Sequence, residues 1–212
     1  MTKCCFISFE GGEGCGKSTQ ARMLAESLSA RGLGVLLTRE PGGTPGAERI
    51  RNLLLDKDSP DWGPRAESLL FAAGRADHVA NAILPALERG DWVLCDRFID
   101  STRAYQGGEG RLTDDDIMAL HAIGSGGLLP DRTVLLVADP DEVARRLAAR
   151  DGDDSDRIGG RDAAYHRRVV DRFEAIAAQE SGRFLRVDAG GTPEQVHARV
   201  MQAISPLLET GR

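Results

Sequence analysis

Residues 11–18, Gly-Gly-Glu-Gly-Cys-Gly-Lys-Ser, match the pattern G-x-x-x-x-G-K-[ST] at every fixed position. They lie between an apolar run at 4–9 and a helical pattern at 18–31, the context that a phosphate-binding loop requires. The glycines let backbone N–H groups turn inward around phosphate oxygens, and the helix start adds partial positive charge. The lysine of such a loop reaches the β- and γ-phosphates, and the serine hydroxyl takes a Mg²⁺ position. The predicted nucleotide-binding residues are Gly11, Gly12, Glu13, Gly14, Cys15, Gly16, Lys17, Ser18 and Thr19.

Short apolar runs that read as strands alternate with helical patterns along the whole chain. The predicted strands are 4–9, 33–38, 92–95, 133–138 and 184–187, and the predicted helices are 18–31, about 45–55, 65–89, 113–123, a helix from near Pro140, about 162–180, and one from about 193. Such alternation indicates a parallel sheet that is covered on both faces. We therefore predict one α/β domain over 1–212, with three α/β/α layers and a central five-stranded parallel sheet.

Composition limits the classes of partner. The formal net charge is −6, and an acidic chain is a poor candidate for wrapping nucleic acid. No apolar run approaches the roughly 20 residues that span a bilayer, and no signal peptide is visible. The four cysteines show no zinc spacing and are predicted to be free thiols. We expect a cytoplasmic protein without nucleic-acid or membrane partners.

The phosphate loop alone leaves several classes open, namely kinases, GTPases, ATPase motors and partition switches. A GTPase needs D-x-x-G after a sheet strand and N-K-x-D for guanine. D-x-x-G occurs at 156–159 and 188–191, but N-K-x-D is absent. The ends of the second and third strands favour a kinase, because TREPGGT at 38–44 and DRFIDSTRAYQGG at 96–108 place acids and arginines opposite the phosphate loop.

Five stretches carry a resemblance to a known family. They are FEGGEGCGKST, TREPGGT, LLFAAGRADH, DRFIDSTRAYQGG and the DRI at 156–158. Together they resemble the bacterial thymidylate kinases, and a weaker similarity of layout covers nearly the whole chain. The resemblance implies transfer of the γ-phosphoryl group of ATP to dTMP, giving dTDP and ADP in dTTP synthesis. It also implies Mg²⁺ as the cofactor and a homodimer. The alternatives are a kinase of another small acceptor, such as dUMP, and a nucleotide-dependent binding switch.

The resemblance also implies which side chains hold dTMP. Phe71 would stack on thymine, with Arg75 one helical turn later on the same face. Arg97 and Arg51 would grip the monophosphate, because the planar arginine fork donates two bonds to phosphate oxygens. The full predicted set is Glu13, Glu40, Arg51, Phe71, Arg75, Arg97, Ser101, Thr102, Tyr105 and Gln106. Tyr105 would exclude a ribose 2′-hydroxyl, and Glu13 would accept a bond from the 3′-OH.

Plainer interpretations of these residues stay open at this point. Phe71 could be a core residue and Arg75 a surface charge, whereas Arg49 could replace Arg51. Glu40 and Glu13 could be solvated loop acids. Asp96, which would hold Mg²⁺ together with Ser18, could instead orient an arginine.

The predicted catalytic residues are Lys17, Glu40, Asp96, Arg97 and Arg157. The transferring oxygens need a cation beyond Lys17 and Mg²⁺. Some thymidylate kinases supply it from an arginine inside the phosphate loop, but the corresponding residue here is Gly14. We therefore predict a mobile lid at about 150–162 that supplies Arg157, with Arg150 and Arg161 as alternatives.

Overall fold

The computed structural model describes residues 4–56, 58, 62–108, 111–151 and 162–209. A parallel sheet of five strands has the order β2-β3-β1-β4-β5. The strands are β1 (Phe6–Glu10), β2 (Val35–Arg39), β3 (Trp92–Asp96), β4 (Arg132–Val137) and β5 (Phe184–Asp188). Each lies within about two residues of its predicted bounds, and the predicted fold class is confirmed.

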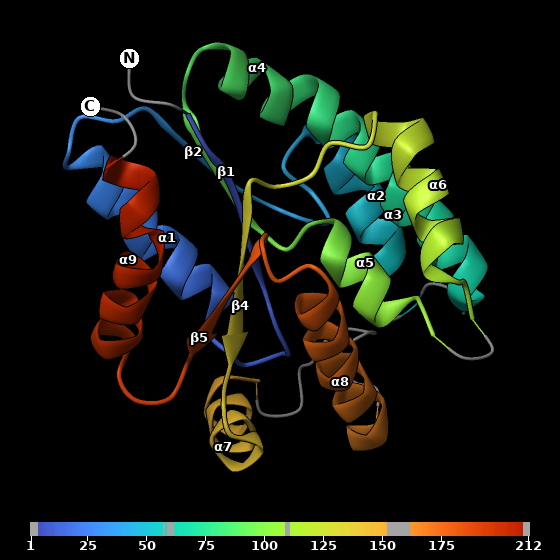
Figure 1. Cartoon of the computed structure of the whole chain (residues 1–212). Coiled ribbons are helices and arrows are strands. Elements are labelled where there is room, and N and C mark those ends of the chain that lie inside the picture. The colour runs from blue at the N-terminus through green and yellow to red at the C-terminus, as the bar shows by residue number, and fades with distance from the viewer. Residues whose placement is uncertain (1–3, 57, 59–61, 109–110, 152–161, 210–212) are drawn as a thin grey trace.

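Helices cover both faces of the sheet and make the outer layers (Figure 1). One face packs against α1 (Lys17–Ser29) and α9 (Pro193–Glu209). The other face packs against α5 (Ile99–Tyr105), α6 (Asp114–Ser125) and α8 (Ala163–Gln179), together with the helical segment that includes α3 (Gly63–His78). The remaining helices are α2 (Pro45–Leu55), α4 (Leu84–Glu88) and α7 (Pro140–Asp151).

Alternating side chains of β1 explain why both faces of the sheet are covered. Ile7 and Phe9 join the core beneath α1 and α9. Phe6 points to the opposite face and joins the core beneath α5 and α6. Because each face of this strand carries at least one large apolar side chain, neither face could be left in water without exposing apolar surface.

The structure differs from the sequence prediction in two helical segments. The single helix expected over 65–89 is divided by a π-helical turn, Val79–Ile83, which joins α3 to α4. Pro85 lies at the start of α4 and has no N–H to donate, which accounts for the break in the α-helical bonding. Helix α5 is absent from the predicted elements, because its seven residues form part of a polar motif with no clear apolar period.

A buried ionic network fastens α5 to the sheet. The Asp100 carboxylate accepts bonds from both Nη atoms of Arg183, at 2.6 and 2.8 Å, and from Arg103 Nη1 at 3.0 Å. Thr133 Oγ1, on β4, donates to the same carboxylate at 3.1 Å. Asp100 is fully buried, so this network holds in place the helix that carries three of the predicted binding residues, Ser101, Thr102 and Tyr105.

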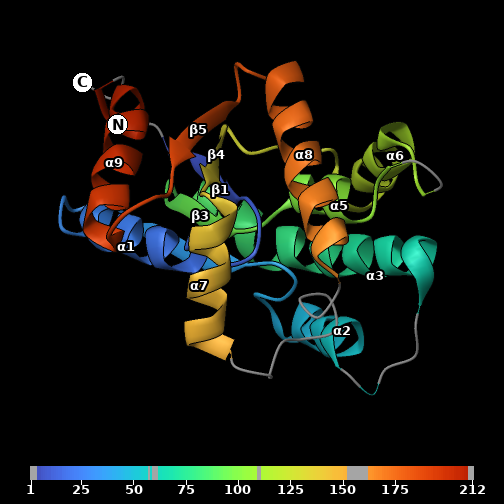
Figure 2. The ribbon, with the colours of Figure 1, turned by 90° about the horizontal axis from the view of Figure 1, so that it is seen from below.

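The order of the strands places the functional loops at one edge. The chain crosses from β1 to β2, returns to β3 beside β1, and then passes to β4 on the other side of β1. In such sheets ligands bind at the carboxyl ends of the strands where the winding reverses. Helix α7 lies at this end, in front of the sheet in Figure 2. Among the described residues there is no helix long and apolar enough to cross a membrane.

Candidate active site

A cavity of about 770 Å³ opens at the carboxyl ends of β1, β2 and β3. It is lined by seventeen of the predicted site residues, which come from five separate stretches of sequence: Glu13, Gly14, Cys15, Gly16, Lys17, Ser18, Thr19, Glu40, Arg51, Phe71, Arg75, Asp96, Arg97, Ser101, Thr102, Tyr105 and Gln106. Arg49 is exposed and does not line it. Arg157 and Arg161 lie outside the described residues. Arg150 belongs to α7, so this helix includes the first two residues of the predicted lid.

The phosphate loop turns directly from β1 into α1. Gly11 has φ 137°, and a Cβ there would meet the carbonyl oxygen of Leu136 at 2.4 Å, so a side chain at this position is excluded twice. Lys17 Nζ donates to the carbonyl oxygens of Gly11 at 3.2 Å and Gly12 at 2.6 Å. Burial and the nearby Arg97 lower the pKa of Lys17 to about 8. A phosphate placed here would offset the cost of burying the charged form of Lys17.

Helix α7 rests on the tip of this loop. Gly14 has φ 74°, and a Cβ at this position would lie 3.0 Å from Leu147 and 3.2 Å from Val143. A loop arginine at residue 14 would therefore require a left-handed backbone and a shift of the Leu147 and Val143 side chains.

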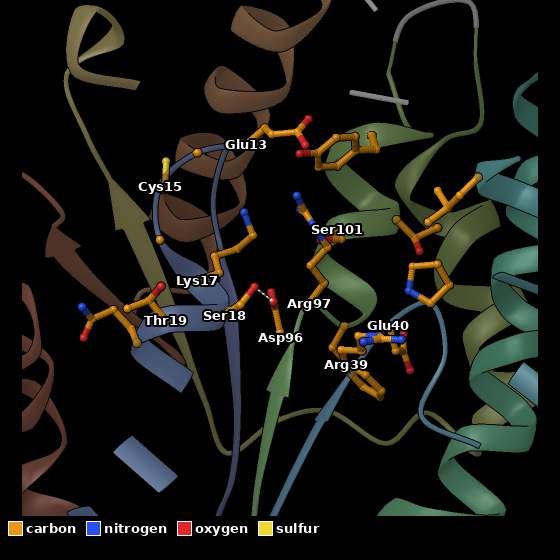
Figure 3. A pocket seen from close by; sticks show the side chains of 18 of the residues that line it. Glu13, Cys15, Lys17, Ser18, Thr19, Arg39, Glu40, Asp96, Arg97 and Ser101 are labelled. Carbon is orange, nitrogen blue, oxygen red and sulfur yellow. Dashed lines mark hydrogen bonds between the residues drawn. The ribbon is translucent and has the colours of Figure 1, made fainter. Parts of the chain in front are cut away.

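Ser18 and Asp96 meet at the mouth of the cavity. The Ser18 hydroxyl donates to Asp96 Oδ2, the bond drawn in Figure 3, while Asp96 Oδ1 is buried and has no hydrogen-bond partner among the residues that the structure describes. A hydroxyl beside an unsatisfied carboxylate oxygen is a donor set of the kind that Mg²⁺ prefers. These two residues therefore fit the predicted metal role.

Arg97 lies between the phosphate loop and α5. Its backbone has φ 68°, a left-handed conformation that is uncommon outside glycine. Its Nη1 donates to Ser101 Oγ at 3.2 Å, and its guanidinium carbon lies 5.0 Å from the centre of the Tyr105 ring. Figure 3 shows Arg97 and Lys17 both pointing into the cavity, so two cations face the space where phosphates would meet.

Glu40 and Arg75 form a buried ion pair in the acceptor half of the cavity. Arg75 Nε donates to Glu40 Oε2 at 2.7 Å, and Arg75 Nη2 donates to Thr102 Oγ1 at 2.9 Å. Only 2% of Arg75 and 5% of Glu40 is exposed, so the interpretations as a surface charge and a solvated acid were wrong. His78, for which the sequence suggested no role, bridges Glu40 at 3.1 Å and Thr38 at 2.7 Å. The peptide bond between Glu40 and Pro41 is cis.

The predicted base and sugar residues occupy the wall formed by α3 and α5. Phe71 is half-buried and lines the cavity, while it also packs against the core cluster around α8, so the two interpretations of this residue are compatible. Gln106 Nε2 donates to Glu67 Oε2 at 3.3 Å. Arg51 Nη1 donates to the carbonyl of Pro41 at 2.7 Å, which ties α2 to the strand-end loop.

Sequence reasoning missed two groups of residues. Gln20, Arg146, Leu147, Gly191, Pro193 and Val196 line the cavity on the side of α7 and α9. They carry no motif and come together only through the fold. Glu10, the last residue of β1, is a fully buried carboxylate. Its signal was a charged residue at the end of an apolar strand. Burial and the nearby Asp100 raise the pKa of Glu10 to about 8.

Comparison with known proteins agrees with this arrangement. The family model described as thymidylate kinase matches residues 9–200. The chain is 56% identical over 203 residues to a thymidylate kinase of Rhizorhabdus wittichii, covering 96% of this chain and 98% of the relative. It is 53% identical to that of Gluconobacter oxydans, covering 96% and 95% of the two chains. The crystal structure of thymidylate kinase from Ehrlichia chaffeensis superposes with a TM-score of 0.77 at 33% identity, covering 96% of this chain and 99% of that one. The chain belongs to the thymidylate kinase family, and it transfers the γ-phosphoryl group of ATP to dTMP, giving dTDP and ADP.

Proposed function

We propose that the cavity holds the two substrates end to end, with the phosphate loop on the donor side and the wall of α3 and α5 on the acceptor side. The observation that carries this proposal is the single cavity lined by both sets of residues. The ATP triphosphate lies along 11–19, and its adenosine extends toward Arg146 and Gly191. The base of dTMP lies against Phe71 and Arg75, and its phosphate reaches Arg97 and Arg51.

The chemistry requires little proton transfer from the protein. The dTMP phosphate is ionised near neutral pH, so no strong general base is needed, and catalysis rests on positioning and charge neutralisation. Lys17 holds the transferring group from the donor side. Arg97 contacts the acceptor phosphate and keeps this contact in the transition state. Glu40 orients Arg75 through their buried ion pair, so its role is to position the base-binding residues.

Mg²⁺ is the proposed cofactor, held by Ser18 and, through water, by Asp96. Asp96 Oδ1, which is buried and finds no hydrogen-bond partner in the described part of the chain, supports this assignment. When bound, the ion neutralises charge on the β- and γ-phosphates of ATP.

Arg157 is the proposed lid arginine, on the strength of its motif Asp156-Arg157-Ile158. The packing of α7 against Gly14 supports a cation from outside the loop, because an arginine at residue 14 would meet Leu147 and Val143. Closure of the segment at about 150–162 would also exclude water, which would otherwise hydrolyse ATP.

A cytoplasmic homodimer is the proposed form of the enzyme, acting in dTTP synthesis. Exposed apolar side chains on neighbouring helices support the pairing: Leu69 on α3 is 57% exposed and Ile123 on α6 is 85% exposed. The two helices pack together where Gly124 approaches Ala72 and Ala76, so both side chains belong to one helical layer.

A coupled assay of ADP release with a panel of nucleoside monophosphates tests the proposal. Wild-type enzyme should turn over rapidly with dTMP, and Lys17→Met should remain folded but lose most of its turnover. Arg97→Ala should raise the KM for dTMP and lower kcat, because the contact persists into the transition state. Wild-type kinetics in either variant would remove that residue from the proposed site.

A further inference from the structure

Glu10 occupies a position that connects the two halves of the cavity. It ends β1 and directly precedes the phosphate loop, and none of its surface is exposed. Its Oε1 accepts bonds from the backbone N–H groups of Phe98 at 2.7 Å and Ser101 at 3.3 Å. Its Oε2 accepts a bond from the Ser101 hydroxyl at 2.6 Å. A carboxylate on the donor side thus holds the turn that leads into α5 on the acceptor side.

The same serine hydroxyl connects Glu10 to Arg97. A hydroxyl has one proton to donate and lone pairs with which to accept. Ser101 donates its proton to Glu10, which leaves its oxygen available to accept from Arg97 Nη1 at 3.2 Å. Arg97 sets the direction of both bonds, because a guanidinium only donates and its positive charge favours the ionised form of Glu10, which only accepts.

The backbone of Arg97 is also held by β1. Its left-handed φ of 68° aims the side chain, and its N–H donates to the carbonyl of Phe9, the residue before Glu10. Two adjacent residues of β1 therefore fix Arg97, one through its backbone and the other through Ser101. A non-glycine residue keeps such a backbone only where its surroundings hold it.

We propose that Glu10 is a positioning residue for Arg97, acting through the Ser101 hydroxyl to hold the guanidinium between the donor and acceptor phosphates. The inference rests on the proposed role of Arg97 as a ligand of the dTMP phosphate. It adds that β1, the strand before the phosphate loop, also positions Arg97, the arginine proposed to bind the acceptor phosphate.

Glu10→Gln is a sharp test, because it keeps the shape of the side chain. The amide oxygen can still accept from Phe98, but the amide nitrogen facing Ser101 would donate instead of accept. The Ser101 proton would then turn toward Arg97 and oppose its bond. We expect kcat/KM for dTMP to fall about tenfold, with losses in both dTMP binding and kcat. The KM for ATP should change little, whereas damage to the phosphate loop would raise it.

A double-mutant cycle separates positioning from a general structural role. The proteins are the single variants Glu10→Gln, Ser101→Ala and Arg97→Ala, and the pairs of Arg97→Ala with each of the other two. Kinetics and dTMP binding by calorimetry are measured together with the melting temperature. Ser8→Ala serves as the control, since it loses a buried hydroxyl bond to Thr133 on the same strand and should keep wild-type kinetics. Glu10→Gln and Ser101→Ala should each impair the wild type and have little further effect on Arg97→Ala.

The outcomes test the proposed role of Arg97 separately from that of Glu10. If Arg97→Ala binds dTMP as the wild type does, the proposed role of Arg97 is wrong. If Arg97→Ala is impaired but Glu10→Gln lowers activity by the same factor with and without Arg97, then Glu10 acts independently and the inference is overturned. Should Glu10→Gln fail to fold, Ser101→Ala decides, because its unchanged kcat/KM for dTMP would also overturn the relay.

Discussion

Tyr105 is the residue at which discrimination between sugars can be tested. Its ring is buried against Tyr165 and Phe173, with ring centroids 6.2 and 6.1 Å away, so it is a rigid wall of the cavity. We expect Tyr105→Ala to narrow the preference for dTMP over its ribose counterpart by about tenfold, because space opens beside C2′. The measurement is the ratio of kcat/KM for the two acceptors. The ratio is more informative than either rate, since loss of the ring also releases Arg97.

Tyr105→Phe is the matched control, because it keeps the ring and removes only the hydroxyl. It should retain the wild-type ratio. An unchanged ratio in Tyr105→Ala would show that another group selects the sugar.

Lys17 makes both the stability and the ATP binding of the enzyme depend on pH. Its pKa is lowered from 10.5 to about 8, so its burial as a cation costs stability below about pH 8, and this cost disappears as the pH rises to 10.5. A bound triphosphate favours the charged form and raises the pKa again. We therefore expect net uptake of protons when ATP binds near pH 8. Calorimetry in two buffers of different ionisation enthalpy measures this uptake.

Lys17→Met separates the lysine from its neighbour Glu10, whose pKa is about 8 as well and which would also take up a proton beside an anion. The variant should take up fewer protons per ATP bound than the wild type. Equal uptake in the two proteins would assign the effect elsewhere.

For single residues, the sequence predicted which residues belong to the site better than it predicted their burial and their contacts. The phosphate loop and the Asp96-Arg97 pair were recognisable because each follows an apolar strand. The burial of Glu40 was not, since its partners Arg75 and His78 lie more than 30 residues away and meet it only after folding.

Among the elements, α5 depends most visibly on a buried charge. Asp100→Asn would remove the fully buried carboxylate that Arg183 and Arg103 share, and would leave them only their more exposed partners Glu180 and Asp114. Breaking a buried pair of this kind costs about 3–5 kcal/mol. We expect the melting temperature to fall by about 10 °C, as scanning calorimetry would measure.

The control for this change is Asp171→Asn on α8, where the carboxylate is exposed and little stability should be lost. If Asp100→Asn and the control have the same melting temperature, the ionic network contributes less to stability than its burial suggests.

The proposed lid at about 150–162, most of which lies outside the described residues, would supply Arg157. We expect Arg157→Ala to lower kcat by about 100-fold with little change in the KM for dTMP, by analogy with arginine fingers supplied from outside a phosphate loop. Saturating kinetics measures this split, and Arg167→Ala, at an exposed position of α8, is the control. A fully active Arg157→Ala enzyme would direct attention to Arg150 or Arg161.

Helices and strands were predicted correctly where the apolar pattern and the flanking residues indicated the same element. All five strands were found because each is a short apolar run that ends in a turn or a polar residue. The break at Val79–Ile83 was missed because the apolar periodicity continues through it, although Pro85 was a visible signal. Helix α5 was missed because its seven residues are too few to show a clear period.

At the scale of the whole molecule, the exposed apolar side chains of α3 and α6 predict self-association. Ile123→Glu would place a charge at the centre of the proposed interface, where an unpaired charge is costly to bury. Light scattering after gel filtration should report a dimer for the wild type and a smaller mass for the variant.

Leu37→Glu, at an exposed position of the edge strand β2, is the control and should remain dimeric. Equal masses for all three proteins would place any interface on another surface.

The division of the cavity between strands and helices has a consequence for how new substrates could arise. Most of the side chains proposed to bind phosphate, Lys17, Ser18 and Arg97, follow the ends of β1 and β3, and Arg51 on α2 is the exception. Phe71, Arg75 and Gln106, by contrast, come from α3 and the end of α5. Mutation on these helices can therefore alter the choice of nucleobase while the transfer machinery stays intact. An enzyme built in this way is open to evolutionary change of acceptor, and nucleoside analogues for it are best varied at the base and the sugar.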